Sequence, residues 1–203
     1  MKKLIVMLLA TTAVVGCNKK ETTTANHSGD STEMTSPTDS GLVKSDSAST
    51  SQNVAETSTL NDQDKKFADA AAKGGMMEVM AGELATKNGT NTGVKTLGEM
   101  MVKDHGKAND ELKQWASANT YTLPASVDAA QQKKYDELKT KKGVEFDRMY
   151  TNLMVGDHKT TIADFKKEIT EGSETSLMAF AKKTLPALEH HLMESEKAQK
   201  AVK

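Results

Sequence analysis

Two short segments of the sequence repeat an arrangement of residues that can bind or position a metal ion. Residues 101–105 and 154–158 share the pattern Met-Val-x-Asp-His, with the two histidines 53 positions apart. In an α-helix, Met and His four positions apart lie on one face, and the Asp directly before the His points about 100° away, toward the edge of that face. His105 and His158 are therefore candidate ligands. The candidate residues that would support them are Met101, Asp104, Met154 and Asp157.

Glu78 and His191 occupy comparable positions on two other helical segments. Each lies near the middle of an apolar face, so that four segments carry one ionisable residue each. Midpoints of antiparallel helices lie at similar heights, so we expect these four side chains to meet at one level of a core. Buried without partners they would cost several kcal/mol.

Three interpretations of these four residues stay open. A metal ion bound by Glu78, His105, His158 and His191 would be a borderline divalent ion such as Zn²⁺, Fe²⁺ or Cu²⁺. A hydrogen-bonded network of the Glu and the His side chains would satisfy them without an ion. In the third, the histidines turn outward.

The helices that must position these residues follow from an apolar period near 3.6. Capping residues and turn residues, including Asn88-Gly89, Pro124 and Gly172-Ser173, mark their ends. Four long helices are predicted at residues 62–88, 92–118, 144–171 and 174–203, with a further helical stretch at 126–142 that breaks near Gly143. We expect an all-α domain, an antiparallel four-helix bundle with the extra helical segment between its second and third helices.

Composition excludes several classes of function. The chain has 203 residues, 27 Lys+Arg against 28 Asp+Glu, and one Cys. A balanced charge argues against nucleic-acid binding, and a single Cys excludes an internal disulfide framework or a Cys-rich metal site. The sequence contains no Gly-x-Gly-x-x-Gly, Walker loop, Gly-x-Ser-x-Gly or His-Glu-x-x-His motif.

The first residues are typical of an export signal. Lys2 and Lys3 precede an apolar run from Leu4 to Val15, and the sequence continues Gly16-Cys17. Small and aliphatic residues before a Cys resemble a bacterial lipobox, which implies that residues 1–16 are removed and Cys17 carries lipid. Two or three acyl chains would anchor the protein firmly to a membrane. Asn18 favours the outer membrane, so we expect a lipid-anchored protein that faces the periplasm.

Residues 17–60 predict a disordered tether between this anchor and a domain at 61–203. Residues 18–60 contain 18 Ser or Thr and no aromatic residue. Such a segment buries too little apolar surface to offset its conformational entropy.

Several motifs from Asp64 onward resemble one family of exported bacterial proteins. The matching residues are Phe67, Gly75-x-x-Glu78, residues 101–105, Leu123-Pro124, Phe146-Asp147-x-x-Tyr150, residues 154–158 and Leu185-Pro186-x-Leu188-x-x-His191-Leu192. Over residues 62–201 the chain resembles the domain of unknown function 4142 family, which implies a ferritin-like bundle and supplies no established activity. Ferritin-like di-iron proteins carry Glu-x-x-His on two helices, and this sequence has no such motif.

Taken together, the sequence favours a membrane-anchored lipoprotein that acts as a binding or stress-protective bundle, with a core metal site, rather than as an enzyme. A metal-dependent redox enzyme is one alternative. A structural or interaction module with a buried Glu–His network is the other. The membrane is the one partner that the sequence indicates.

Overall fold

The computed structural model describes residues 60–203, which form five helices and contain no strand. These are α1 (Asp62–Asn88), α2 (Thr92–Ala118), α3 (Ala129–Lys139), α4 (Gly143–Glu171) and α5 (Thr175–Ala201). The predicted all-α bundle is confirmed, and α1 and α2 have the predicted bounds. α3 is shorter than the predicted stretch 126–142. The predicted signal peptide, Cys17 and tether through residue 59 lie outside the described residues.

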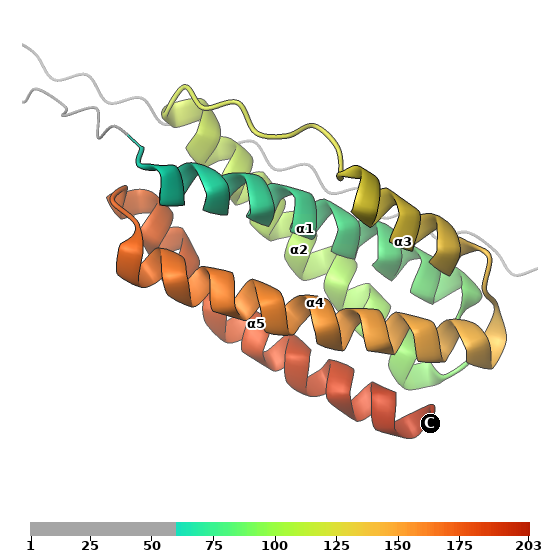
Figure 1. Cartoon of the computed structure of the whole chain (residues 1–203). Coiled ribbons are helices and arrows are strands. Elements are labelled where there is room, and N and C mark those ends of the chain that lie inside the picture. Colours follow the sequence, from blue (N-terminus) through green and yellow to red (C-terminus); the bar gives the residue numbers. More distant parts are fainter. Residues whose placement is uncertain (1–59) are drawn as a thin grey trace, which may run out of the picture. The chain divides into compact units, whose positions relative to one another are not determined.

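The four long helices form two antiparallel hairpins that pack side by side (Figure 1). α1 pairs with α2 and α4 pairs with α5, while α1 also contacts α4 and α2 also contacts α5. The connection from α2 to α4 must return along the length of the bundle, and α3 lies within it against α1 and α4. One long crossover between two hairpins is the connectivity of ferritin-like folds.

Local sequence explains where several helices begin. Asn61 and Asp64 form a capping box at the start of α1, and Asp128 and Gln131 form another at α3. α4 begins at Gly143 without a side-chain cap. Gly143 has φ +60°, in the left-handed region that favours glycine, so the chain turns there between α3 and α4.

A buried aspartate from one hairpin holds the turn of the other hairpin at each end of the bundle. At one end the Asp147 carboxylate accepts hydrogen bonds from the Thr90 amide at 3.0 Å, the Thr90 hydroxyl at 2.6 Å and the Asn91 amide at 2.9 Å. At the other end Asp64 accepts from the amides of Ser173 at 2.9 Å and Glu174 at 3.2 Å. Because these bonds cross between the hairpins, they fix the height of one hairpin relative to the other.

Glu168 lies beside Asp64 at this second end and is fully buried. Its Oε2 accepts a hydrogen bond from Gln63 Nε2 at 3.2 Å, and its Oε1 has no partner. Burial, reinforced by the charges of Asp64 and Glu174, raises the pKa of Glu168 to about 7. The native structure therefore stabilises the protonated form of this carboxyl group.

α1 and α2 approach each other closely at a pair of glycines. A Cβ added at Gly98 would lie 2.7 Å from both the Gly82 carbonyl oxygen and the Ala85 Cβ, and a Cβ at Gly82 would lie 2.7 Å from the Gly98 carbonyl oxygen. No side chain fits between these backbones. The two glycines therefore set the spacing of the first hairpin.

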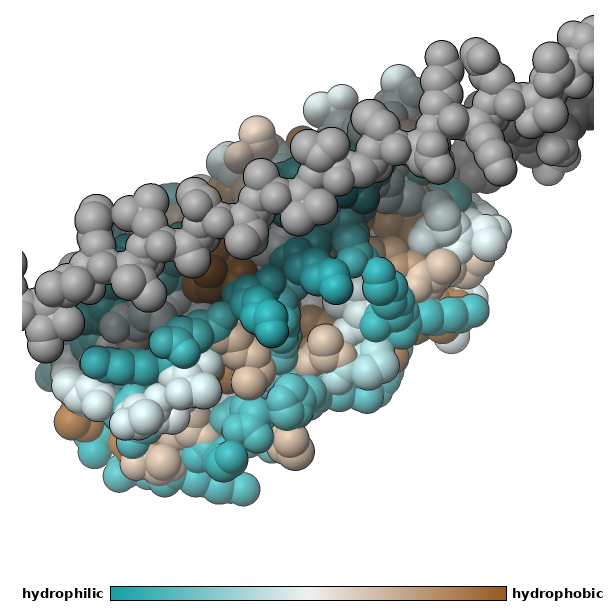
Figure 2. Space-filling model, turned by 180° about the vertical axis from the view of Figure 1, so that it is seen from behind, coloured by the Kyte–Doolittle hydropathy of each residue, from teal (hydrophilic) through white to brown (hydrophobic). Residues whose placement is uncertain are grey.

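The apolar core is divided into two clusters, one toward each end of the bundle. One contains Met101, Phe146, Tyr150 and Met154, and the other contains Phe67 and Phe165 among its members. On the face seen in Figure 2, hydrophilic side chains lie among less polar ones. Within residues 60–203, no helix is both long enough and apolar enough to cross a bilayer.

Candidate metal centre

Four polar residues form a layer between the two apolar clusters. Glu78 comes from α1, His105 from α2, His158 from α4 and His191 from α5, and none is more than 5% exposed. In each helix the clusters flank this residue on both sides along the chain. The structure therefore brings together the four residues that the sequence placed at one level.

Glu78 lies against two of the histidines. Its Oε2 is 2.9 Å from His105 Nδ1, and its Oε1 is 3.4 Å from His158 Nδ1. His158 Nδ1 is also 2.9 Å from the carbonyl oxygen of Met154, one turn earlier in α4. Both Nδ1 atoms face oxygens that only accept hydrogen bonds, so each must carry a proton and donate it.

The third histidine has its own acidic partner. His191 Nε2 lies 3.0 Å from Asp104 Oδ2, across the α2–α5 contact. The same reasoning places the proton on Nε2 of His191. Every imidazole of the layer thus has one nitrogen committed to an oxygen acceptor, which fixes its tautomer whenever the ring is neutral.

The remaining ring nitrogens have no partner. They are His105 Nε2, His158 Nε2 and His191 Nδ1, all buried, and the Glu78 Oε1 atom lacks a well-formed hydrogen bond as well. In a neutral imidazole whose other nitrogen is protonated, this second nitrogen carries an exposed lone pair. Buried lone pairs without donors are costly, so their concentration in one layer calls for a chemical explanation.

The three imidazoles surround one point. Their ring centroids are 5.6 Å apart for His105 and His158, 5.1 Å for His105 and His191, and 5.4 Å for His158 and His191. One ring nitrogen from each lies within 4.8 Å of the others, so the three form a group that can hold a metal ion. The centre of a triangle with such sides is roughly 2.8 Å from each corner, less than 1 Å beyond a typical Zn–N bond of about 2.1 Å.

Charge in the layer is balanced by the histidines. Burial would raise the pKa of Glu78, but the positive charges of His105 and His158 outweigh it and lower that pKa to about 2. Burial would lower the pKa of His105, but the adjacent Glu78 carboxylate has the larger effect, so that the pKa of His105 is raised overall. Burial, helped by the other two imidazoles and opposed by Asp104, lowers the pKa of His191 to about 4. His191 is therefore neutral at pH 7.

Comparison with known sequences identifies the family of this chain. The family described as Domain of unknown function (DUF4142) matches residues 49–198. The chain belongs to the DUF4142 family. This confirms the resemblance seen in the sequence, and the match covers all four residues of the layer. The curated proteins and the solved structures contain no match to this DUF4142 chain.

The residues predicted to support the site in this DUF4142 protein lie in different surroundings. Asp104 contacts His191, and Met154 contacts His158 through its backbone carbonyl. Met101 is fully buried in the apolar cluster. Asp157 pairs instead with Lys134 of α3 at 3.2 Å, and burial together with the charge of Glu78 raises its pKa despite that pair.

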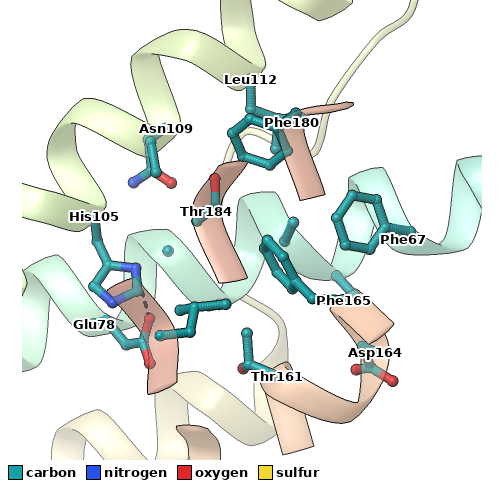
Figure 3. Close-up of a pocket in the computed structure, with 16 residues that line it drawn as sticks. Phe67, Glu78, His105, Asn109, Leu112, Thr161, Asp164, Phe165, Phe180 and Thr184 are labelled. Carbon is teal, nitrogen blue, oxygen red and sulfur yellow. Dashed lines mark ion pairs between the residues drawn. The ribbon is translucent and has the colours of Figure 1, made fainter. Parts of the chain in front are cut away.

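Two further residues near the layer of the DUF4142 domain were not among the sequence candidates. The Tyr150 hydroxyl is buried without a partner, and burial together with the Glu78 charge raises the pKa of this phenol. Asn109 lies one turn beyond His105 and lines a cavity with it (Figure 3). For both residues the available signal was a polar group on an apolar face, four residues from a histidine for Asn109 and eight for Tyr150.

Proposed function

We propose that this protein binds one divalent metal ion through His105 Nε2, His158 Nε2 and His191 Nδ1. The observation that carries the proposal is that each ring has an oxygen acceptor at one nitrogen and a buried, partnerless nitrogen at the other. Acceptors at the distal nitrogen of a histidine ligand orient the ring and increase its basicity. A hydrogen-bonded network alone would leave these three buried ring nitrogens without a partner.

The chemistry of the donors favours a borderline ion. Three neutral imidazoles suit Zn²⁺, Cu²⁺ or Fe²⁺, and among the described residues no Cys is available to select a softer ion. Three protein ligands leave at least one coordination position free for water or another small molecule. Such a site can hold an ion and expose it to one exogenous ligand.

We assign the Glu78 carboxylate to positioning rather than to ligation. Its two oxygens already face protonated Nδ1 atoms, of His105 and His158. As an anion it would offset part of the charge of a bound divalent ion in a buried layer. Asp104 has the matching role for His191.

The activity best supported is therefore metal holding, by a binding or stress-protective module. We propose further that lipid on Cys17 anchors this module to the outer membrane on its periplasmic side; the motif at residues 1–17 supports this. A redox enzyme built on the same ion is separable by assay, because it would turn over an oxidant and a simple binder would not.

The test is elemental analysis of the full-length protein, purified in detergent through a tag that contains no histidine. We expect close to one Zn, Fe or Cu per chain, and loss of that metal in His158→Ala. His190→Ala is the matched control, because His190 adjoins the site in sequence but is exposed. Metal-free protein that also fails to bind added Zn²⁺, Fe²⁺, Co²⁺ or Cu²⁺ would refute the proposal.

A further inference from the structure

A small cavity lies directly beside the polar layer. Glu78 and His105 form one side, and the rings of Phe67, Phe165 and Phe180 lie around the other (Figure 3). Its volume is about 40 Å³. Since a water molecule needs roughly 10–15 Å³ by this measure, the cavity has room for a molecule of two or three heavy atoms.

A glycine makes room for the one amide that lines this cavity. A Cβ added at Gly75 would lie 2.0 Å from Asn109 Oδ1, so only glycine allows the Asn109 side chain to rest on α1 at this point. Thr161 and Thr184 add hydroxyl groups to a lining that is otherwise mostly apolar. The lining thus offers a few hydrogen-bonding groups within an apolar enclosure, as small-molecule sites do.

The charge of the lining selects against anions. Glu78 and Asp164 are the acids in it, its one histidine, His105, is already paired with Glu78, and no Lys or Arg lines it. An anion would have to approach Glu78 in a medium of low dielectric constant, where repulsion between like charges is strong. A neutral molecule meets no such barrier.

A surface groove borders the cavity. A groove of about 290 Å³ between α1, α3 and α4 shares Ala70, Gly74, Glu78, Thr161 and Asp164 with it. The groove is lined at its outer part by Lys134 and Asp157, which form an ion pair. The groove therefore brings solvent up to the same residues that line the cavity.

We infer that this cavity binds a neutral diatomic molecule of the class of dioxygen or nitric oxide and presents it to the ion at the three histidines. The inference has two halves, uptake of the molecule into the cavity and its delivery to the ion. Only the second half rests on the proposed metal site. The first half, uptake of a diatomic molecule into the cavity, requires no ion. The two halves can be tested separately.

Uptake is measured on metal-free, methyl-labelled full-length protein under dissolved dioxygen, whose paramagnetism speeds the relaxation of nearby methyl groups. Leu188 lines the cavity and Leu138 lies in the other core cluster, and both are at most 1% exposed. We expect a several-fold larger relaxation enhancement at Leu188 than at Leu138. Equal enhancement at the two methyl groups would overturn the inference.

Gly74→Leu fills the cavity, and Gly156→Leu is its control. Both glycines are helical, and a Cβ at either meets no atom within 4 Å, but only Gly74 lines the cavity. We expect Gly74→Leu to reduce the enhancement at Leu188 to the level of Leu138, and Gly156→Leu to leave it unchanged. Retained enhancement in Gly74→Leu would place the bound molecule elsewhere and overturn the inference.

Access to the ion is measured with nitric oxide on protein loaded with Fe²⁺, by electron paramagnetic resonance. We expect an iron–nitrosyl signal in the wild type and in Gly156→Leu, and its loss in Gly74→Leu with iron content unchanged. An equal signal in Gly74→Leu would show approach from another side and overturn the second half. Absence of bound iron, cobalt or zinc would refute the metal site itself, while the dioxygen measurement would still decide on the cavity.

Discussion

Replacing Glu78 with Gln tests whether the layer is organised as its hydrogen bonds indicate. Gln has nearly the same shape as Glu, but one of its two terminal groups is an NH₂ that can only donate. In the native layer both carboxylate oxygens face Nδ1 atoms, at 2.9 Å in His105 and 3.4 Å in His158. In Glu78→Gln the NH₂ group must therefore face one of these Nδ1–H groups, so that two hydrogen-bond donors meet without an acceptor.

The size of the effect follows from these contacts. A hydrogen bond to a charged group contributes about 1.5–3 kcal/mol and a neutral one about 0.5–1.5 kcal/mol. At His105 the substitution replaces a hydrogen bond to a charged group with a neutral one. This should lower the free energy of unfolding of the metal-free protein by about 1–2 kcal/mol. His158 is less affected, because the Met154 carbonyl still accepts its proton at 2.9 Å. Loss of an orienting carboxylate should also weaken metal binding by about 10- to 100-fold.

The assays are urea unfolding with and without Zn²⁺, and competition for Zn²⁺ against a chromophoric chelator. Glu83→Gln is the matched control, since Glu83 lies in the same helix with an exposed side chain. The control should leave both quantities unchanged. If Glu78→Gln bound Zn²⁺ as tightly as the wild type, Glu78 would have no positioning role and the reasoning from the Nδ1 contacts would be refuted.

Three other predictions concern pH, packing and anchoring. The folded-state pKa of Glu168, about 7, lies above its ordinary value of 4.5, so ionisation destabilises the fold by roughly 3 kcal/mol at high pH, and none of this loss is present below pH 4.5. Glu168→Gln should therefore be the more stable protein at pH 8.5, and its advantage should shrink toward pH 5. The measurement is urea unfolding of both proteins across this range, and a difference in unfolding free energy that did not change with pH would contradict the prediction. Gly98→Ala should lower the free energy of unfolding by about 1–3 kcal/mol through overpacking against Gly82, whereas Gly156→Ala, in open space, should raise it by about 0.5–1 kcal/mol; equal changes in denaturation midpoint would contradict the close approach. Cys17→Ser should move the protein from the membrane fraction to the soluble fraction, and unchanged fractionation would argue against the lipid anchor.

Much of the helical framework could be predicted from the sequence because its signals are local. The apolar period and the Asn61 and Asn91 caps define α1 and α2 to the residue. The convergence of Glu78 with the histidines could also be predicted. Each apolar face carries one polar residue near its middle, and short turns keep the midpoints of neighbouring helices at similar heights. Such arguments use only spacing along single helices and the antiparallel rule.

The partners of each ring atom could not be predicted in this way. Asp104 and Asp157 occupy the same place in a repeated motif, yet one contacts His191 and the other contacts Lys134. The difference arises from what the neighbouring helix presents: α5 offers an imidazole to Asp104, whereas the crossover brings α3 and its lysine to Asp157. Rotation of a helix by a few tens of degrees decides such contacts, and a period of 3.6 does not fix it.

The division of the layer between two hairpins bears on how the protein folds. Each hairpin is built from contacts close in sequence and can form early, whereas Glu78 and His105 meet His158 and His191 only when the hairpins dock across a long chain closure. We therefore expect the three free nitrogens to come together late, after the main folding barrier. An ion bound there should therefore prolong the lifetime of the native state by slowing unfolding, and leave the rate of folding almost unchanged.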